Sequence, residues 1–183
     1  MNCIDFSGMA VSKNTHKNNK KRIVRMSAAL LALASTTYNP DLIRAQTLSC
    51  PQSFLFGNYT TCASTETSTI SPAGARTTSG CLSAGGAPFN AAQCNVSQTF
   101  PVTNVSISVT AASFTVKNAT SKTMVVDNFS CRFQGSITTK TGTCSFTTSG
   151  FFFLMDIGAR LNVGNPQESG TYSGTFTVQT NFP

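Results

Sequence analysis

The most regular alternation of apolar and polar residues lies at the C-terminal end of the sequence, over residues 170–183. One set of alternate positions is aromatic, aliphatic or short: Tyr172, Gly174, Phe176, Val178, Thr180 and Phe182. The positions between them, from 171 to 181, carry only hydroxyl or amide side chains. Because successive side chains of a strand point to opposite faces, this period of two predicts a strand with one buried face. We expect Phe176, Val178 and Phe182 to anchor it.

Two further patterns predict where other strands lie. Phe129, Cys131 and Phe133 share one predicted face, and Cys144 and Phe146 share another beyond a glycine-bounded turn, so the two segments are expected to pair as a hairpin. Residues 151–155 are apolar at every position, and residues 157–163 are expected to continue the same strand. A strand that is apolar on both faces is typical of the centre of a sheet.

Residues 62–94 differ, because Thr, Ser, Ala and Gly dominate them and their periodicity is weak. This composition predicts long loops and edge strands held by disulfides. Across the chain, many short strands at close spacing predict an all-β fold, an immunoglobulin-like antiparallel β-sandwich stabilised by disulfides. We expect a single sandwich domain over residues 46–183.

The first 45 residues predict a signal peptide or leader. A basic stretch, Lys20–Arg25, precedes the short apolar run Met26–Ala34, as in secretory signals. The run is shorter than the roughly 20 apolar residues that a membrane span needs. Cleavage is expected after Ala45 or, as an alternative, after Ala34. Export to the periplasm, the outer cell surface or the medium follows from this prediction.

Cysteine usage agrees with export. Of seven cysteines, Cys3 lies in the leader, and the even remainder predicts disulfides: Cys50, Cys62, Cys81, Cys94, Cys131 and Cys144. Fifteen pairings are possible for six cysteines. The spacing favours closure of local loops, with 50 to 62, 81 to 94 and 131 to 144 as the pairs. A zinc site is not expected, because the sequence has no C-x2-C motif and its one histidine lies in the leader.

Charge does not predict a nucleic-acid site, although the net charge is +7. Seven of the 13 basic residues precede residue 46, and the six that follow are scattered and opposed by four acids. Phosphate binding needs clustered Lys and Arg. We therefore expect no nucleic-acid partner and no membrane span.

No catalytic constellation is evident, and we expect a protein that is not an enzyme and has no cofactor or metal. Without a histidine beyond residue 45, the usual general base is missing. Asp127 and Asp156 are the only candidates for a paired-carboxylate hydrolase, which is a minor alternative. Each is interpreted instead as an acid at a strand end or turn that accepts hydrogen bonds from nearby backbone amides.

Several motifs together resemble an exported bacterial family, the domain of unknown function 4402. They are Phe56-Gly57, residues 71–80, residues 105–116, residues 124–129, residues 157–163 and the ending G-x-Y-x-G-x-F-x-V at Gly170–Val178. The resemblance covers roughly residues 50–182. It implies an exported β-rich domain and carries no catalytic residues.

The ending also resembles the subunits of chaperone–usher pili, which end on an amphipathic strand. A penultimate aromatic and a glycine 14 residues from the end correspond to Phe182 and Gly170. That resemblance implies a sandwich whose groove is filled by another chain's extended segment, with Gly170, Tyr172, Phe176, Val178 and Phe182 along the assembly edge. The residues before Cys50 fit a donor segment poorly, because Pro40 interrupts them.

The functional prediction is therefore a structural, adhesive or binding protein of the bacterial envelope that acts through β-sheet surfaces. The alternative is a pilus-type subunit assembled by strand complementation. Expected partners are further copies or other envelope proteins, joined by strand addition, and a periplasmic chaperone.

Overall fold

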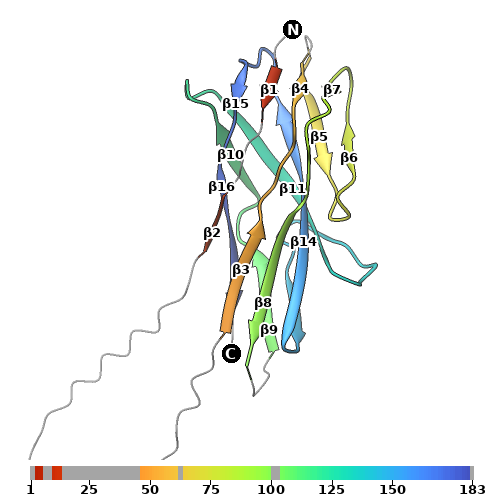
Figure 1. The fold of residues 1–183 in the computed structure, drawn as a ribbon, viewed down its shortest axis with the longest axis vertical. Helices are drawn as coiled ribbons and strands as arrows, with labels where there is room; N and C mark the ends of the chain where they lie inside the picture. The colour runs from red at the N-terminus through yellow and green to blue at the C-terminus, as the bar shows by residue number, and fades with distance from the viewer. Residues whose placement is uncertain (1–2, 6–9, 14–45, 62–63, 100–103, 182–183) are drawn as a thin grey trace, which may run out of the picture.

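The computed structural model describes residues 3–5, 10–13, 46–61, 64–99 and 104–181 (Figure 1). Their regular secondary structure consists of strands alone. Across these ranges there is accordingly no helix long and apolar enough to cross a membrane. The all-β class predicted from the sequence is confirmed.

The large sheet has eight strands. Its centre is β14 (Phe152–Val163), which pairs along one edge with β11 (Thr123–Phe133). Along its other edge, β14 pairs first with β8 (Ala92–Gln98) and then with β5 (Glu66–Ile70). The remaining strands extend these neighbours, all in antiparallel pairs: β3 (Gln46–Gln52), β6 (Arg76–Thr78), β10 (Ser113–Lys117) and β12 (Lys140–Thr141).

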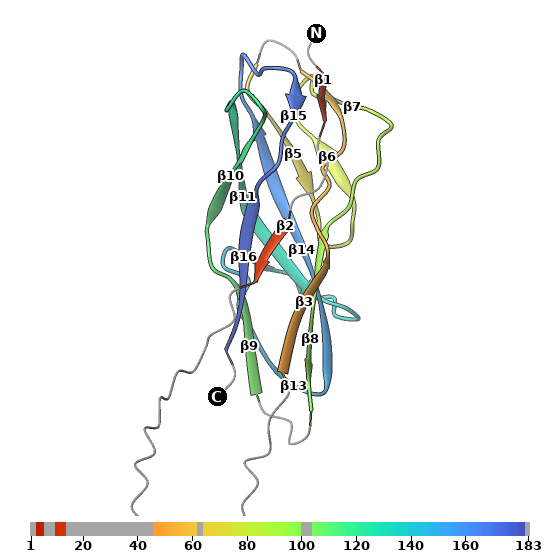
Figure 2. The ribbon, with the colours of Figure 1, turned by 60° about the vertical axis from the view of Figure 1, so that its left-hand side comes forward.

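A second sheet of four strands faces the large sheet. Its order is β13 (Phe146–Ser149), β9 (Asn104–Val109), β16 (Thr175–Asn181) and β2 (Ala10–Lys13). A small sheet at one end of the molecule has the order β15 (Gly170–Thr171), β1 (Cys3–Asp5), β4 (Tyr59–Thr60) and β7 (Ser83–Ala84). Figure 2 shows the two larger sheets forming an elongated sandwich.

The core lies between these two sheets and is rich in phenylalanine. Phe54, Phe129 and Phe176 are almost fully buried, and Phe114 packs against them. The ring centroids of Phe129 and Phe176 are 5.8 Å apart, and those of Phe54 and Phe176 are 5.2 Å apart. Burial of each such side chain contributes about 1.5–3 kcal/mol to folding. The predicted sandwich is therefore held by one continuous aromatic core.

The prediction of loops and edge strands for residues 62–94 is wrong at β5. This strand pairs with the central β14, and alternate residues, Glu66, Ser68 and Ile70, are buried. Two of the three buried positions are polar, which hid the period of two in the sequence. The Tyr59 hydroxyl hydrogen-bonds Ser68, and the Glu66 carboxylate accepts the Cys81 backbone N–H at 2.8 Å. These partners compensate the loss of water around the buried polar groups.

Two of the three predicted local disulfides are wrong. Cys50 pairs with Cys94, 44 residues away, which excludes both the 50–62 and the 81–94 pairings. The physical reason is that β3 and β8 are antiparallel neighbours that bring Cys50 and Cys94 side by side. Cys81 is also disulfide-bonded, and Cys62 lies outside the described residues. The predicted pair of Cys131 and Cys144 is confirmed.

That confirmed disulfide does not lie in the predicted hairpin. At Cys131, β11 pairs with β14 on one edge and with the short β12 on the other, where Cys131 is opposite Lys140. Phe146 belongs to β13, which pairs with β9 in the second sheet. The bond from Cys131 to Cys144 therefore joins the large sheet to the loop that enters the second sheet, across a Cα separation of 5.5 Å.

Candidate functional site: a slot beside the C-terminal strand

The last strand of the chain has a different kind of partner on each edge. On one edge, β16 pairs antiparallel with β9, with Val178 opposite Val109. On the other edge it pairs in parallel with β2, with Phe176 opposite Val11. Figure 2 shows β2 between β16 and β3, and the two segments β2 and β3 are in contact.

The same edge continues upstream into β15. There Gly170 is opposite Ile4 in a parallel pair, and Ile4 is also opposite Tyr59 of β4 in an antiparallel pair. The strand β1 therefore lies between β15 and β4 and joins them into one sheet. We call the space that β1 and β2 occupy, between β15–β16 on one side and β4 and β3 on the other, the slot. Within residues 46–181 as described, no strand pairs with the slot edge of β15 or β16.

Three buried side chains fix the C-terminal strand along the slot. Tyr172, Phe176 and Val178 are each no more than 2% exposed, as the sequence alternation predicted. The Tyr172 hydroxyl accepts a 2.6 Å hydrogen bond from Gln167 Nε2 and donates a 2.8 Å bond to the Glu168 carbonyl. Burial raises the pKa of the Tyr172 phenol above its usual value. Burial and these hydrogen bonds therefore hold the C-terminal segment in a fixed position along the slot.

A glycine allows the C-terminal segment to cross β10 closely. A Cβ atom on Gly174 would lie 2.7 Å from the carbonyl oxygen of Thr115. Just before it, Lys117 and Ser173 exchange two backbone hydrogen bonds of 2.8 and 2.9 Å. The crossing connects the second sheet to the edge of the large sheet. Only glycine fits at position 174, because any side chain there would collide with β10.

A comparison with protein-family models matches residues 47–182 to the domain of unknown function DUF4402. The chain belongs to the DUF4402 family. The resemblance inferred from the sequence is thereby confirmed. Searches of curated proteins and of solved structures found no match.

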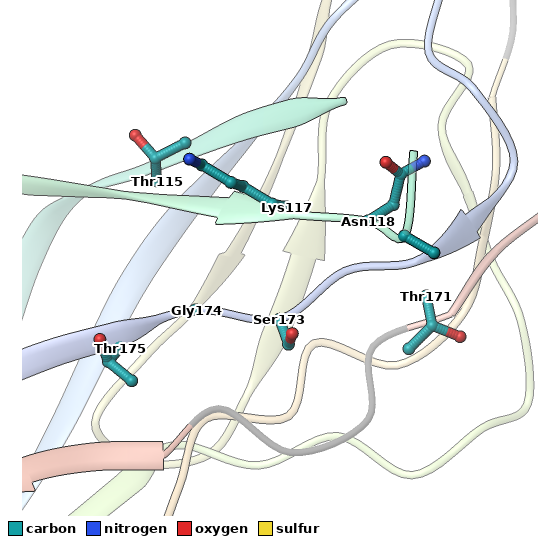
Figure 3. A pocket seen from close by; sticks show the side chains of 8 residues that line it. Thr115, Lys117, Asn118, Thr171, Ser173, Gly174 and Thr175 are labelled. Carbon is teal, nitrogen blue, oxygen red and sulfur yellow. The ribbon is translucent and has the colours of Figure 1, made fainter. Parts of the chain in front are cut away.

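The crossing in this DUF4402 domain leaves a hollow of about 570 Å³ on the outer side of the C-terminal strand. Figure 3 shows that it lies between the end of β10 and residues 171–175. Its lining is polar and small: Thr115, Lys117, Asn118, Ala119, Thr171, Ser173, Gly174 and Thr175. The hollow is open to solvent and brings together one cation and several hydroxyl groups.

In the DUF4402 domain, each of the two acids considered for hydrolysis forms an ion pair with an arginine on the neighbouring strand. Asp127 accepts hydrogen bonds from Arg160 Nε at 2.9 Å and from Arg160 Nη2 at 3.1 Å. These bonds hold the pKa of Asp127 below its usual value. Asp156 accepts a 2.9 Å hydrogen bond from Gln93 Nε2 and lies 4.0 Å from Arg132.

The interpretation of these acids as turn residues bonded to backbone amides is therefore wrong. Both lie inside strands, and the antiparallel register of β11 and β14 places an arginine opposite each. Neither acid lines the hollow of Figure 3. No group of three or more His, Cys, Asp or Glu residues suited to a metal ion occurs in the described part of the chain.

The predicted central strand of this DUF4402 domain is exposed at its start. Phe151 and Phe152 are 59% and 56% exposed, whereas Met155 and the alternate residues after it are buried. The exposed pair lies where the chain passes from β13 into β14. A shallow hollow of about 200 Å³ there is lined by Phe133, Phe152 and Phe153 together with Gln134 and Leu154.

The predicted edge residues fall on the slot with one exception. Gly170 and Tyr172 lie at its β15 end, and Phe176 and Val178 lie at its β16 end. Phe182 lies outside the described residues. The sequence analysis considered residues 35–49 as a donor segment and did not single out residues 3–5 and 10–13, which pair with this edge.

Proposed function

We propose that this protein is a non-enzymatic, exported structural or adhesive protein of the bacterial cell envelope that joins other chains by β-strand addition in the slot. One observation carries the proposal. Among the described residues, only 3–5 and 10–13 pair with the slot edge of β15 and β16, and they are distant in sequence from both strands. An extended segment from another chain would make the same backbone hydrogen bonds.

On this proposal, export leaves the edge of β15 and β16 without its strand partners. Residues 3–13 fall within the expected leader, so cleavage after Ala34 or Ala45 would remove both β1 and β2 from the folded domain. The strand edge would then expose backbone N–H and C=O groups beside the buried Phe176 and Val178. Unpaired strand edges are templates for pairing with another chain. A mature domain of this kind is complete only when a partner supplies the missing strand.

A pilus-type subunit is the specific form of this function that the slot supports. The C-terminal strand borders the slot, as the resemblance to pilus subunits implies. Its inward residues Tyr172, Phe176 and Val178 belong to the core and to the docking edge at once. Partners on this proposal are further copies, other envelope proteins, or a periplasmic chaperone that protects the edge before assembly.

The test compares the processed protein with the full chain. The gene would be expressed with its leader in a bacterial host, and the envelope fraction analysed by intact mass spectrometry and size-exclusion chromatography. We expect a processed chain that forms strand-linked oligomers or is recovered only with a partner. The matched control is the full chain, refolded under oxidising conditions, which should remain monomeric. A processed chain that is a stable, monodisperse monomer would contradict the proposal.

A further inference from the structure

A second hollow lies where β11 ends beside the beginning of β14, and it shares no residue with the slot. We call it the aromatic hollow; it has a volume of about 200 Å³ and is lined by Phe133, Gln134, Phe152, Phe153 and Leu154. β11 pairs with β14 as far as Phe133, and one further bond of 2.9 Å joins the Gln134 backbone N–H to the Leu154 carbonyl. The chain then turns away at Gly135. In the described part of the chain, the edge of β14 beside Phe152 therefore has no strand partner where the hollow lies.

The aromatic rings of this hollow differ in how firmly they are held. Phe133 and Phe153 pack against the core, with ring centroids 6.1 Å apart, and the ring centroid of Phe146 lies 4.4 Å from that of Phe133. Phe152 is 56% exposed, because alternation along β14 turns it away from the core face that carries the buried Met155. The hollow therefore combines a base of anchored rings with one ring that is open to a ligand.

Polar side chains border this exposed ring on the outer face of the large sheet, the face turned away from the second sheet. Phe152 is opposite Ser97 of β8, and Leu154 is opposite Asn95. Residues opposite each other on neighbouring strands share a face. Across β14, the exposed Gln134 adds a second amide. The ring is thus surrounded by hydroxyl and amide groups, and not by a continuous apolar surface.

An arginine with donor capacity to spare lies further along the same face. Arg132 is opposite Asp156, and its Nη2 atom lies 4.0 Å from the carboxylate, which is a long contact for an ion pair. Among the described residues, the Nε atom of Arg132 has no hydrogen-bond partner. From Phe152 to Asp156 the strand extends about 13 Å, at about 3.3 Å per residue. A ligand along this face would meet the exposed ring at one end and the arginine at the other.

We propose that the aromatic hollow and the polar face beside it bind a neutral carbohydrate, an oligosaccharide of hexopyranose units. A sugar ring presents a face of C–H groups that stacks on an aromatic ring, and a rim of hydroxyl groups that donate and accept hydrogen bonds. Phe152 supplies the stacking surface. The amides of Gln134 and Asn95 and the guanidinium of Arg132 supply partners for the rim. The site is separate from the slot and does not depend on strand addition.

Other occupants fit this surface less well. Phe151 and Phe152 are 59% and 56% exposed, which leaves roughly 100 Å² of apolar area on each. A stable protein interface buries about 800 Å² on each partner. An apolar protein or lipid surface would also cover Arg132 and Asp156 and remove water from them without new hydrogen bonds, which is unfavourable. A sugar replaces that water with its own hydroxyl groups. Because the hollow itself is lined by uncharged residues, a neutral sugar is favoured over an acidic one.

The test places the full chain, refolded under oxidising conditions, on a printed array of neutral glucose, mannose and galactose oligosaccharides. We expect binding to at least one of them, and the glycan with the strongest signal is then titrated by calorimetry. Phe152→Ala should weaken its binding about tenfold, because the stacking surface is lost. Phe152→Tyr keeps a ring and should bind within about threefold of wild type. Both variants should fold normally, since the side chain is exposed.

Phe151→Ala is the matched control, because Phe151 is as exposed as Phe152 but does not line the hollow. It should leave glycan binding unchanged. Absence of binding to every glycan on the array would overturn the proposal, and so would equal losses for Phe151→Ala and Phe152→Ala. A loss for Phe152→Tyr as large as that for Phe152→Ala would exclude stacking as the basis of binding. Binding to phosphatidylcholine vesicles that is lost in Phe152→Ala, with no binding to glycans, would assign the hollow to a lipid surface instead.

Discussion

The ring centroid of Phe176 lies 5.2 Å from the ring centroid of Phe54 and 5.5 Å from that of Phe114. Phe54 follows β3, and Phe114 lies on β10, so one side chain of the last strand contacts both borders of the large sheet. The C-terminal strand is therefore part of the core as well as the wall of the slot.

Replacement of Phe176 by alanine should strongly destabilise the domain. The substitution removes a fully buried ring and leaves a cavity among three other aromatic rings, so we expect a loss of about 3–5 kcal/mol in the free energy of unfolding. A urea melt monitored by fluorescence measures it. Thr175→Ala, at the exposed neighbouring position, should change stability by less than about 0.5 kcal/mol. A loss below about 1 kcal/mol for Phe176→Ala would refute its role in the core.

A methyl group at Gly174 should push β10 and β16 apart. Its Cβ would lie 2.7 Å from the Thr115 carbonyl oxygen, which belongs to a paired strand and cannot move freely. We expect Gly174→Ala to cost about 1–3 kcal/mol in thermal or chemical unfolding. Gly86→Ala is the matched control, because a Cβ there meets nothing within 4 Å. Comparable behaviour of the two variants would show that the crossing is looser than the structure indicates.

The two described disulfides should contribute unequally to stability. In the chain-entropy model, the loop of 44 residues between Cys50 and Cys94 is worth about 4 kcal/mol, and the loop of 13 between Cys131 and Cys144 about 3 kcal/mol. Paired Cys→Ser variants of each bond, compared in denaturant melts, test this order. Peptide mapping without reduction should recover both bonds. A fragment that links Cys81 to Cys94 would contradict the structure.

The ion pair between Asp127 and Arg160 should make stability fall in acid. Because the folded state lowers the pKa of Asp127, the contribution is fully present above the ordinary carboxyl pKa and is lost as the pH falls through the lowered value. The pair is partly exposed, so we expect less than about 1 kcal/mol. The stability difference between wild type and Asp127→Asn should therefore shrink from about pH 7 to about pH 2. Arg160→Gln should show the same trend, and a difference that is constant with pH would exclude this origin.

Local patterns predicted the elements whose environment is uniform along the strand. Tyr172, Phe176 and Val178 alternate with polar residues because one face of their strand is covered along its length. The apolar run over residues 151–155, continued by residues 157–163, predicted a central strand, and β14 is indeed paired along both of its edges. The sequence also predicted the bond between Cys131 and Cys144, although the strands around it are paired differently.

The sequence could not predict features that depend on distant pairing. Cys50 and Cys94 meet because β3 and β8 are neighbours, and nothing near either cysteine encodes that. The buried Glu66 and Ser68 looked like surface residues, since their hydrogen-bond partners come from other segments. The slot escaped prediction for the same reason, because its edge and its occupant lie at opposite ends of the chain.

The change of partner along β14 has a consequence for unfolding. The first half of this strand is paired with β8 and the second half with β5, while β11 pairs with its other edge from Met155 to Asn162, across the changeover. Gly158 sits at the changeover, where any side chain would collide with the backbone of Ile70. Neither half of the large sheet can open without disturbing a strand that the other half shares. The domain should therefore lose its structure in one cooperative step, and the amide hydrogens around Gly158 should be the last to exchange with solvent.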